Sequence, residues 1–183
     1  MSKPIACRGA LPPLPPKRLA AFQRWLREYW ERDVTLPAEY VAQLLAYHGG
    51  TPTRRFFKAG RKQRELGQFL HLAMSRELPP PRKSSWRSWG HSRDGRLDYH
   101  LREFHDNEYW AVRLEDSEAL LPIAAVQSSL DYREMEQFDL LCLDYSSSDD
   151  APTVVIWETP GFGALTKVAP SFAGFLQKCQ RAA

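Results

Sequence analysis

The sequence predicts an α+β fold, in which N-terminal helices pack on a mostly antiparallel sheet and a C-terminal helix closes the domain. Helical periodicity dominates the first part of the chain, whereas runs rich in Val, Ile and aromatic residues, typical of strands, dominate the second. Short turns join these later runs, and the regular helix–strand alternation that builds parallel sheets is absent. With 183 residues, 43% hydrophobic and 26% charged, the chain is long enough for one domain with a substantial core.

Two helices are predicted at the start of the domain. In residues 17–32 (KRLAAFQRWLREYWER) apolar residues recur on one face, and arginines cover the other. Residues 36–50 (LPAEYVAQLLAYHGG) predict a second amphipathic helix with a proline in its first turn. We expect Gly49 and Gly50 to end this helix in a left-handed cap, and His48 to lie at its end, where a cationic ring interacts favourably with the helix dipole.

The middle of the chain is less regular. Residues 51–57 (TPTRRFF) predict a strand or an extended segment, and residues 61–77 recover helical spacing before three prolines end the helix. We interpret residues 78–98 as an insertion, because long irregular segments are usually functional or disordered. The proline-rich residues 1–16 predict an extended, mobile arm. The expected organisation is therefore this arm followed by a single domain over residues 17–183.

Strands follow in the second half. Three are predicted, and they cover Leu120–Val126 (LLPIAAV), Phe138–Tyr145 (FDLLCLDY) and Thr153–Thr159 (TVVIWET). A short turn containing Asp149 and Asp150 connects the last two strands. Val168 predicts a short edge strand, and Ser171 is the expected N-cap of a closing helix that runs to Gln180.

The net charge of +3 conceals a strong asymmetry along the chain. Residues 1–102 carry 20 Lys/Arg and 8 Asp/Glu, a balance of +12, whereas residues 103–160 carry 2 and 14, a balance of −12. Residues 161–183 add 3 basic residues and no acid. The fold either presents one basic and one acidic face, or neutralises the two halves internally. Sequence patterning leaves both alternatives open.

The sequence contains no motif that indicates catalysis or cofactor binding. Residues 100–105 (HLREFH) lack the HExxH spacing of a zinc helix, and there is no GxSxG elbow or glycine-rich phosphate loop. Cys7, Cys142 and Cys179 are widely spaced, which argues against a zinc ribbon or a disulfide framework, and Cys142 is expected to be buried. We therefore expect no enzymatic activity, no cofactor and no metal.

A tryptophan- and arginine-rich stretch lies within the insertion. It contains Trp86, Arg87, Trp89 and Arg93. Arginines contact phosphates and aromatic rings stack on unpaired bases, so the stretch is a candidate nucleic-acid-binding loop. Alternatively, the tryptophans pack against the sheet and the arginines are solvated, which is the interpretation that we prefer. No apolar run of about 18 residues and no signal peptide is present, so we expect no membrane span and a cytoplasmic location.

Five motifs, in order, resemble the Smi1/Knr4 (SUKH) superfamily. LPAEYVAQLLAYHGG is similar to its N-terminal helix, with His48 in place of an Asn before the two glycines. LLPIAAV, FDLLCLDY and TVVIWET are similar to three successive strands, and VAPSFAGFLQK to the start of the last helix. The resemblance covers about residues 17–60 and 100–180. It does not cover the proline-rich arm or the insertion.

This resemblance implies a non-enzymatic binding module. Bacterial members are typically immunity proteins encoded beside polymorphic toxins, including type VI secretion effectors, and the toxins often act on nucleic acids. The expected partner is a cognate protein toxin whose active site is occluded, without direct binding of this chain to nucleic acid. The oligomeric state is left open. The alternative is a nucleic-acid-binding or regulatory adaptor that uses the Trp/Arg-rich loop.

Acidic side chains are the candidate toxin contacts, since an acidic surface complements the basic nucleic-acid groove of a toxin and raises the association rate. The candidates are Glu115, Asp116, Glu118, Asp149 and Asp150. Further candidate contacts, from the insertion, are Trp86, Arg87, Trp89 and Arg93.

Overall fold

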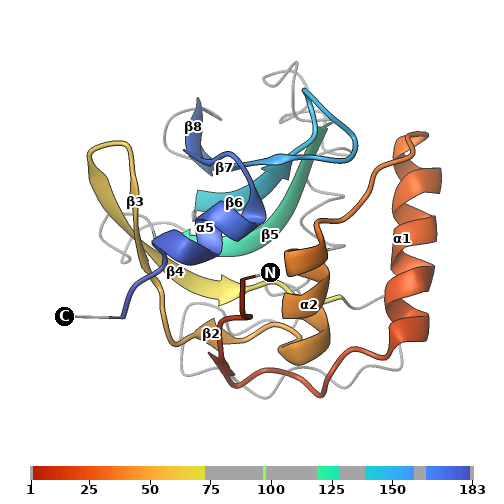
Figure 1. The fold of residues 1–183 in the computed structure, drawn as a ribbon, viewed down its shortest axis with the longest axis horizontal. Helices are drawn as coiled ribbons and strands as arrows, with labels where there is room; N and C mark the ends of the chain where they lie inside the picture. Colours follow the sequence, from red (N-terminus) through yellow and green to blue (C-terminus); the bar gives the residue numbers. More distant parts are fainter. Residues whose placement is uncertain (1, 73–96, 98–118, 128–138, 159–163, 182–183) are drawn as a thin grey trace, which may run out of the picture.

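The computed structural model describes residues 2–72, 97, 119–127, 139–158 and 164–181 (Figure 1). The elements in chain order are β1 (Cys7–Arg8), α1 (Pro16–Trp30), α2 (Ala38–Ala46), β2 (Thr51–Pro52), β3 (Phe56–Ala59), β4 (Lys62–Phe69), β5 (Leu120–Gln127), β6 (Asp139–Asp144), β7 (Thr153–Glu158), β8 (Ala164–Ala169) and α5 (Phe172–Lys178). The structure combines helices α1, α2 and α5 with an antiparallel sheet. This combination confirms the predicted α+β class.

Six strands form the main sheet in the order β3-β4-β5-β6-β7-β8, and every neighbouring pair is antiparallel. The strand order follows the chain order, as is common for consecutive strands, although residues 70–119 separate β4 from β5. Irregularities interrupt the register in three pairings: β4 with β5, β5 with β6, and β7 with β8. Bulges bend strands and increase twist. The sheet is curved enough for its two edge strands, β3 and β8, to lie in contact.

The predicted helix over residues 61–77 is wrong where the structure describes it, because Lys62–Phe69 is strand β4. A tight hairpin turn at Gly60 and Arg61 pairs β4 with β3, and Ala59 lies opposite Lys62. The register shift between Leu66 and Gln68 explains the misleading pattern. It places Leu66 and Phe69 on the same core face, and this three-residue spacing imitates a helix. Residues 73–77 lie outside the described part.

The sheet buries apolar side chains on both faces. On the helix-covered face, strands and helices share the main core, as in the edge-to-face contact of Phe57 with Phe175 (ring centroids 5.3 Å apart). A smaller cluster lies on the opposite face and consists of Leu120, Leu140, Cys142, Val155 and Trp157. Strands buried on both faces read as continuous apolar runs, which explains the sequence FDLLCLDY. The predicted burial of Cys142 is confirmed, with 0% exposure.

The N-terminal arm is packed against the domain, so the prediction of a mobile arm is wrong. Ile5 is 1% exposed and Leu14 is 2% exposed. The Gln43 side-chain amide makes two hydrogen bonds with the Ile5 backbone: Ile5 N donates to Oε1 (2.7 Å) and Nε2 donates to Ile5 O (2.9 Å). Strand β1 pairs with β2, beside the end of α2. Polar side chains of α2 thus hold the arm in place.

The closing helix α5 is built as predicted. Ser171 caps its N-terminus by accepting a hydrogen bond at Oγ from Gly174 N (3.1 Å). Phe172, Phe175 and Leu176 are buried, and α5 contacts β3, β7 and β8, so it lies where the sheet edges approach each other. In the described residues, no helix is long and apolar enough to cross a bilayer.

Candidate functional site

The two glycines after α2 lie where three chain segments meet. Both have positive φ, +77° at Gly49 and +89° at Gly50, but they do not cap the helix as predicted, since α2 ends at Ala46 and Tyr47 is extended. A Cβ on Gly50 would lie 2.7 Å from the Arg8 carbonyl oxygen. Phe69 N donates to Gly50 O (3.0 Å). The glycines therefore allow the arm and β4 to approach the same turn closely.

His48 joins these segments through its ring and its backbone. Leu72 N donates to the ring Nε2 (2.8 Å), Leu11 N donates to the His48 carbonyl (2.9 Å), and the ring also interacts with the Pro12 backbone. Burial lowers the pKa of His48 below its ordinary value of 6.5. Since Nε2 accepts a hydrogen bond, the ring is neutral. The prediction of a cationic ring at the helix dipole is therefore wrong.

The candidate contacts Asp149 and Asp150 lie in the turn between β6 and β7 and interact with the connection between α1 and α2. The Arg32 guanidinium pairs with the Asp149 carboxylate and donates to the Tyr145 carbonyl (2.9 Å). Thr35 N donates to the Asp149 carbonyl (2.9 Å), and Thr35 Oγ1 donates to Asp150 Oδ1 (2.7 Å). The two aspartates thus connect the β6–β7 turn to the segment between α1 and α2. Their role as toxin contacts stays a prediction.

The remaining candidate contacts lie outside the described residues. They are Glu115, Asp116 and Glu118 of the acidic set and Trp86, Arg87, Trp89 and Arg93 of the insertion. The segment HLREFH at residues 100–105 also lies outside. The structure therefore brings together only Asp149 and Asp150 from the predicted set.

A buried charged cluster, formed by Arg64, Asp139 and Glu158, connects β4 with β6 and β7. Arg64 lies 3.3 Å from Asp139 Oδ2 through Nη1 and 2.5 Å from Glu158 Oε1 through Nη2. Thr166 Oγ1 also donates to Glu158 Oε1 (3.0 Å), which extends the connection to β8. The side chain of Arg64 is only 5% exposed. This cluster ties the β3–β4 hairpin to the last two strands of the sheet.

A basic surface that the sequence analysis did not single out lies on the β3–β4 hairpin. The segment from Arg54 to Glu65 (RRFFKAGRKQRE) contains six basic residues and one acidic residue. Arg55 pairs with Glu65 (2.8 Å) and Arg64 is buried, whereas Lys58, Arg61 and Lys62 are exposed. The charge run was visible in the sequence, but the helix predicted from residue 61 divided it between two elements. The hairpin brings these bases together around one turn, where Lys58 lies opposite Gln63 and Lys62 lies opposite Ala59, so Lys58 and Lys62 face opposite sides of the two strands.

The described residues offer little for metal or thiol chemistry. Among them, no group of three or more His, Cys, Asp or Glu side chains could hold a metal ion. The three cysteines are free. Burial raises the pKa of Cys7 and of Cys179 to about 12, and that of Cys142 well above its ordinary value. All three thiols are therefore protonated at neutral pH, which makes them poor nucleophiles.

The helices, the antiparallel sheet and the Gly49–Gly50 turn form an α+β domain. This is the fold that the resemblance of the five sequence motifs implied. The sequence model of the SMI1 / KNR4 family (SUKH-1) matches residues 14–178, so the match includes both long helices, the whole sheet and the closing helix. The chain belongs to the SMI1 / KNR4 family. Comparison with curated proteins finds no match, and comparison with solved structures finds none.

Proposed function

We propose that this chain is an immunity protein that acts in the cytoplasm, binds a cognate protein toxin and occludes its active site. The observation that carries the proposal is family membership over residues 14–178, because bacterial relatives of this kind are typically immunity proteins. The toxin is a secreted polymorphic or type VI effector that acts on nucleic acid. The chain contributes a binding surface rather than catalytic groups.

The described structure supports a binding role in two ways. The side chains that carry its buried charges, Arg64 and Asp139, are held by other parts of the fold, and the thiols are protonated. In the described residues, contacts connect the arm, the sheet and the last helix, so the surface that these residues form is preorganised. Preorganisation reduces the conformational entropy lost on binding and so favours tight association.

The test has two steps. First, the tagged protein is used to recover partners from lysate of its source organism, and a recovered effector is identified by mass. Second, the effector is expressed in a sensitive host with and without this chain. We expect growth arrest by the effector alone and full growth when this chain is present. Continued arrest in the presence of a folded, expressed chain contradicts the immunity role.

Three of the five acidic candidates can be tested with the recovered toxin. Neutralising Glu115, Asp116 and Glu118 to the corresponding amides removes charge from one group of candidates. We expect slower association with the toxin, since complementary charge acts mainly on the association rate. Unchanged association kinetics at low salt would remove these three residues from the contact surface.

The adaptor alternative depends on the Trp/Arg-rich residues of the insertion. It predicts binding to RNA or DNA in the absence of any toxin, with an affinity that falls steeply as salt increases. Titration of a labelled RNA oligomer at two salt concentrations separates the two hypotheses. The immunity role predicts no such binding.

A further inference from the structure

The end of the β3–β4 hairpin carries three bases within five residues of the chain. Lys58, Arg61 and Lys62 are exposed, and in the described part of the chain no carboxylate lies within salt-bridge distance of any of them. The nearest acid in sequence, Glu65, pairs with Arg55. Like charges this close repel one another, and a partner of opposite charge relieves that repulsion.

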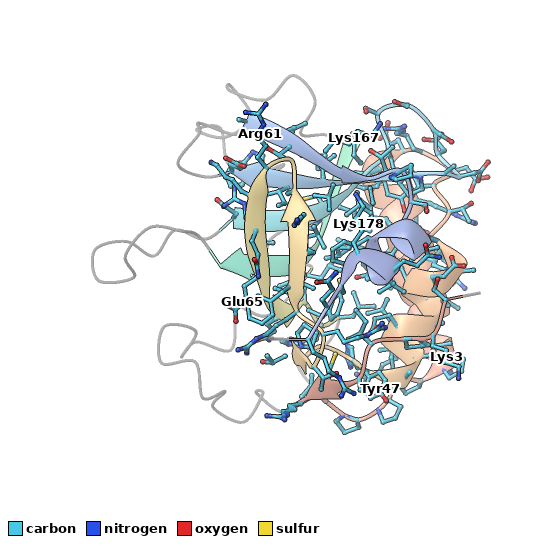
Figure 2. The ribbon with its side chains drawn as sticks, turned by 60° about the vertical axis from the view of Figure 1, so that its left-hand side comes forward. Lys3, Tyr47, Arg61, Glu65, Lys167 and Lys178 are labelled. Carbon is cyan, nitrogen blue, oxygen red and sulfur yellow. The ribbon has the colours of Figure 1, made fainter. Side chains whose placement is uncertain are left out.

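Strand β8 extends this positive surface. It is the opposite edge of the sheet, but the curvature brings it into contact with β3, and Figure 2 shows Arg61 and Lys167 at the same end of the molecule. The register places Lys167 opposite Val155 and Leu165 opposite Trp157, so both face away from the helix-covered side. Lys167 is exposed, and Leu165, at 38%, is the exposed large hydrophobic residue of the described chain.

The buried cluster beneath this surface holds the hairpin and β8 in a fixed relation. Arg64 lies opposite Phe57 on β3, binds Glu158 on β7, and shares that carboxylate with Thr166 on β8. Lys58 and Lys167 are the chain neighbours of Phe57 and Thr166. Phe57 in turn packs on Phe175. The exposed bases therefore project from rigid elements, which lowers the entropic cost of binding.

The composition of this surface favours a protein partner over a nucleic acid. Leu165 supplies an apolar contact beside Lys167, and protein interfaces combine apolar contacts with polar side chains at their rim. Binding of single-stranded nucleic acid relies on exposed aromatic rings that stack on bases. In the described residues the large exposed hydrophobic side chain is aliphatic, and Phe56 is half-buried with the Arg55 guanidinium 5.4 Å from its ring centroid.

We propose that Lys58, Arg61, Lys167 and Leu165, with Lys62 on the other side of the hairpin turn, form a docking surface for an acidic face of a protein partner. The inference rests on the proposed immunity role only for the identity of the partner, which is the toxin if that role holds. It adds that the toxin meets this chain through an acidic region, separate from any basic nucleic-acid groove that it possesses. Arg61 and Lys167 lie at the opposite end of the molecule from Lys3 and Tyr47 (Figure 2).

A charge-reversal series tests the surface without the toxin. The variant K58E/R61E/K62E is compared with K3E/K17E/R24E, which reverses three exposed bases elsewhere and has the same net charge. The probe is a fluorescent polyglutamate peptide at low salt, with a labelled RNA oligomer as the second probe. We expect the hairpin variant to bind polyglutamate at least about tenfold more weakly than wild type and the control within about twofold.

Three results would overturn the proposal. One is that wild type fails to bind polyglutamate. Another is an equal loss in the control, which assigns the effect to net charge alone. The third is tighter binding of the RNA oligomer than of polyglutamate, lost in the same hairpin variant, which assigns the surface to nucleic acid. The neutral variant K58Q/R61Q/K62Q, expected to show an intermediate loss, provides a reading if charge reversal prevents folding.

The toxin rescue assay then places the partner on this surface. The hairpin variant and L165S are expected to lose protection, whereas K3E/K17E/R24E keeps it. If wild type itself gives no protection, the immunity role fails, while the polyglutamate titration still reports on the docking surface. If wild type and the hairpin variant protect equally, the surface is not where the toxin binds and the inference fails although the immunity role holds.

Discussion

At the scale of single residues, the turn after α2 depends on the absence of a side chain at Gly50. A Cβ there would lie 2.7 Å from the Arg8 carbonyl oxygen and 2.8 Å from Ala10 N, both of them backbone atoms. Backbone atoms cannot rotate away as a flexible side chain does, so the arm would have to move. The turn is therefore a sensitive point at which the arm is joined to the domain.

We expect Gly50→Ala to lower the free energy of unfolding by about 2–4 kcal/mol. Positive φ costs an alanine about 1 kcal/mol, and the forced contact adds about 1–3 kcal/mol. Gly9→Ala is the matched control, because Gly9 also has positive φ (+65°) but a Cβ there meets nothing within 4 Å. It should cost only about 1 kcal/mol. Urea denaturation measures both, and equal losses would mean that the close approach is unimportant.

His48 predicts a stability that depends on pH. The pKa of the folded state is below the ordinary 6.5, so on acidification the unfolded state takes up the proton first. The stabilisation is therefore complete above about pH 6.5 and is lost as the pH falls below that value, with a slope of at most about 1.4 kcal/mol per pH unit. Protonation also removes the acceptor for Leu72 N.

The variant His48→Asn isolates this effect, because Asn does not titrate and is the residue that the family motif has at this position. Unfolding is followed between pH 7 and pH 5 in both proteins. Subtraction removes the contributions of groups that do not interact with His48. We expect a shallower pH dependence in the variant. Parallel curves would show that His48 is not the titrating group.

At the scale of elements, the arm and α2 form one unit. Ile5 lies in the main core, and both of its backbone hydrogen bonds go to the Gln43 side chain of α2. A buried amide that satisfies two backbone groups is costly to leave unpaired, by about 1–3 kcal/mol. The arm therefore contributes to folding although its composition is that of a linker.

We expect Ile5→Ala to lower the free energy of unfolding by about 2–5 kcal/mol, the range for large-to-small changes in a core. Lys3→Ala, two residues earlier and exposed, should change it by less than about 0.5 kcal/mol. Thermal or urea unfolding of both variants measures the difference. A mobile arm, as its proline content predicted, would make the two variants equal.

At the scale of the whole molecule, the two alternatives for the charge asymmetry both hold in part. Arg32 pairs with Asp149 at the surface, and the buried Arg64 pairs with Asp139 and Glu158, so basic residues of the first half neutralise acids of the second. The hairpin bases Lys58, Arg61 and Lys62 remain exposed. Among the described residues, neutralisation between the two halves therefore leaves exposed bases on the hairpin.

We expect removal of the central charge, Arg64→Met, to lower the free energy of unfolding by about 3–5 kcal/mol, because the buried Asp139 and the partly buried Glu158 lose their shared guanidinium. The triple variant R64M/D139L/E158L should recover most of this loss, since a well-packed apolar cluster avoids the desolvation penalty. Arg55→Met breaks a more exposed pair and should cost less than about 1 kcal/mol. A triple variant as unstable as the single one would refute this account.

The sequence by itself determined the elements whose signals are local. The two helices, the three central strands and the Ser171 cap follow from periodicity, β-propensity and a single hydroxyl, and all were predicted within a few residues. The family followed from short motifs in the right order. These features depend on neighbours along the chain, which a sequence displays directly.

Only the tertiary structure decided the rest. Strand β4 was predicted as a helix because its bulge imitates helical spacing, and only pairing with β3 and β5 removes the ambiguity. The arm, the neutral state of His48 and the shared carboxylate of Glu158 all depend on contacts between residues far apart in the chain. The proposed docking surface arises in the same way, because sheet curvature brings its two edges together, and no local pattern encodes that approach.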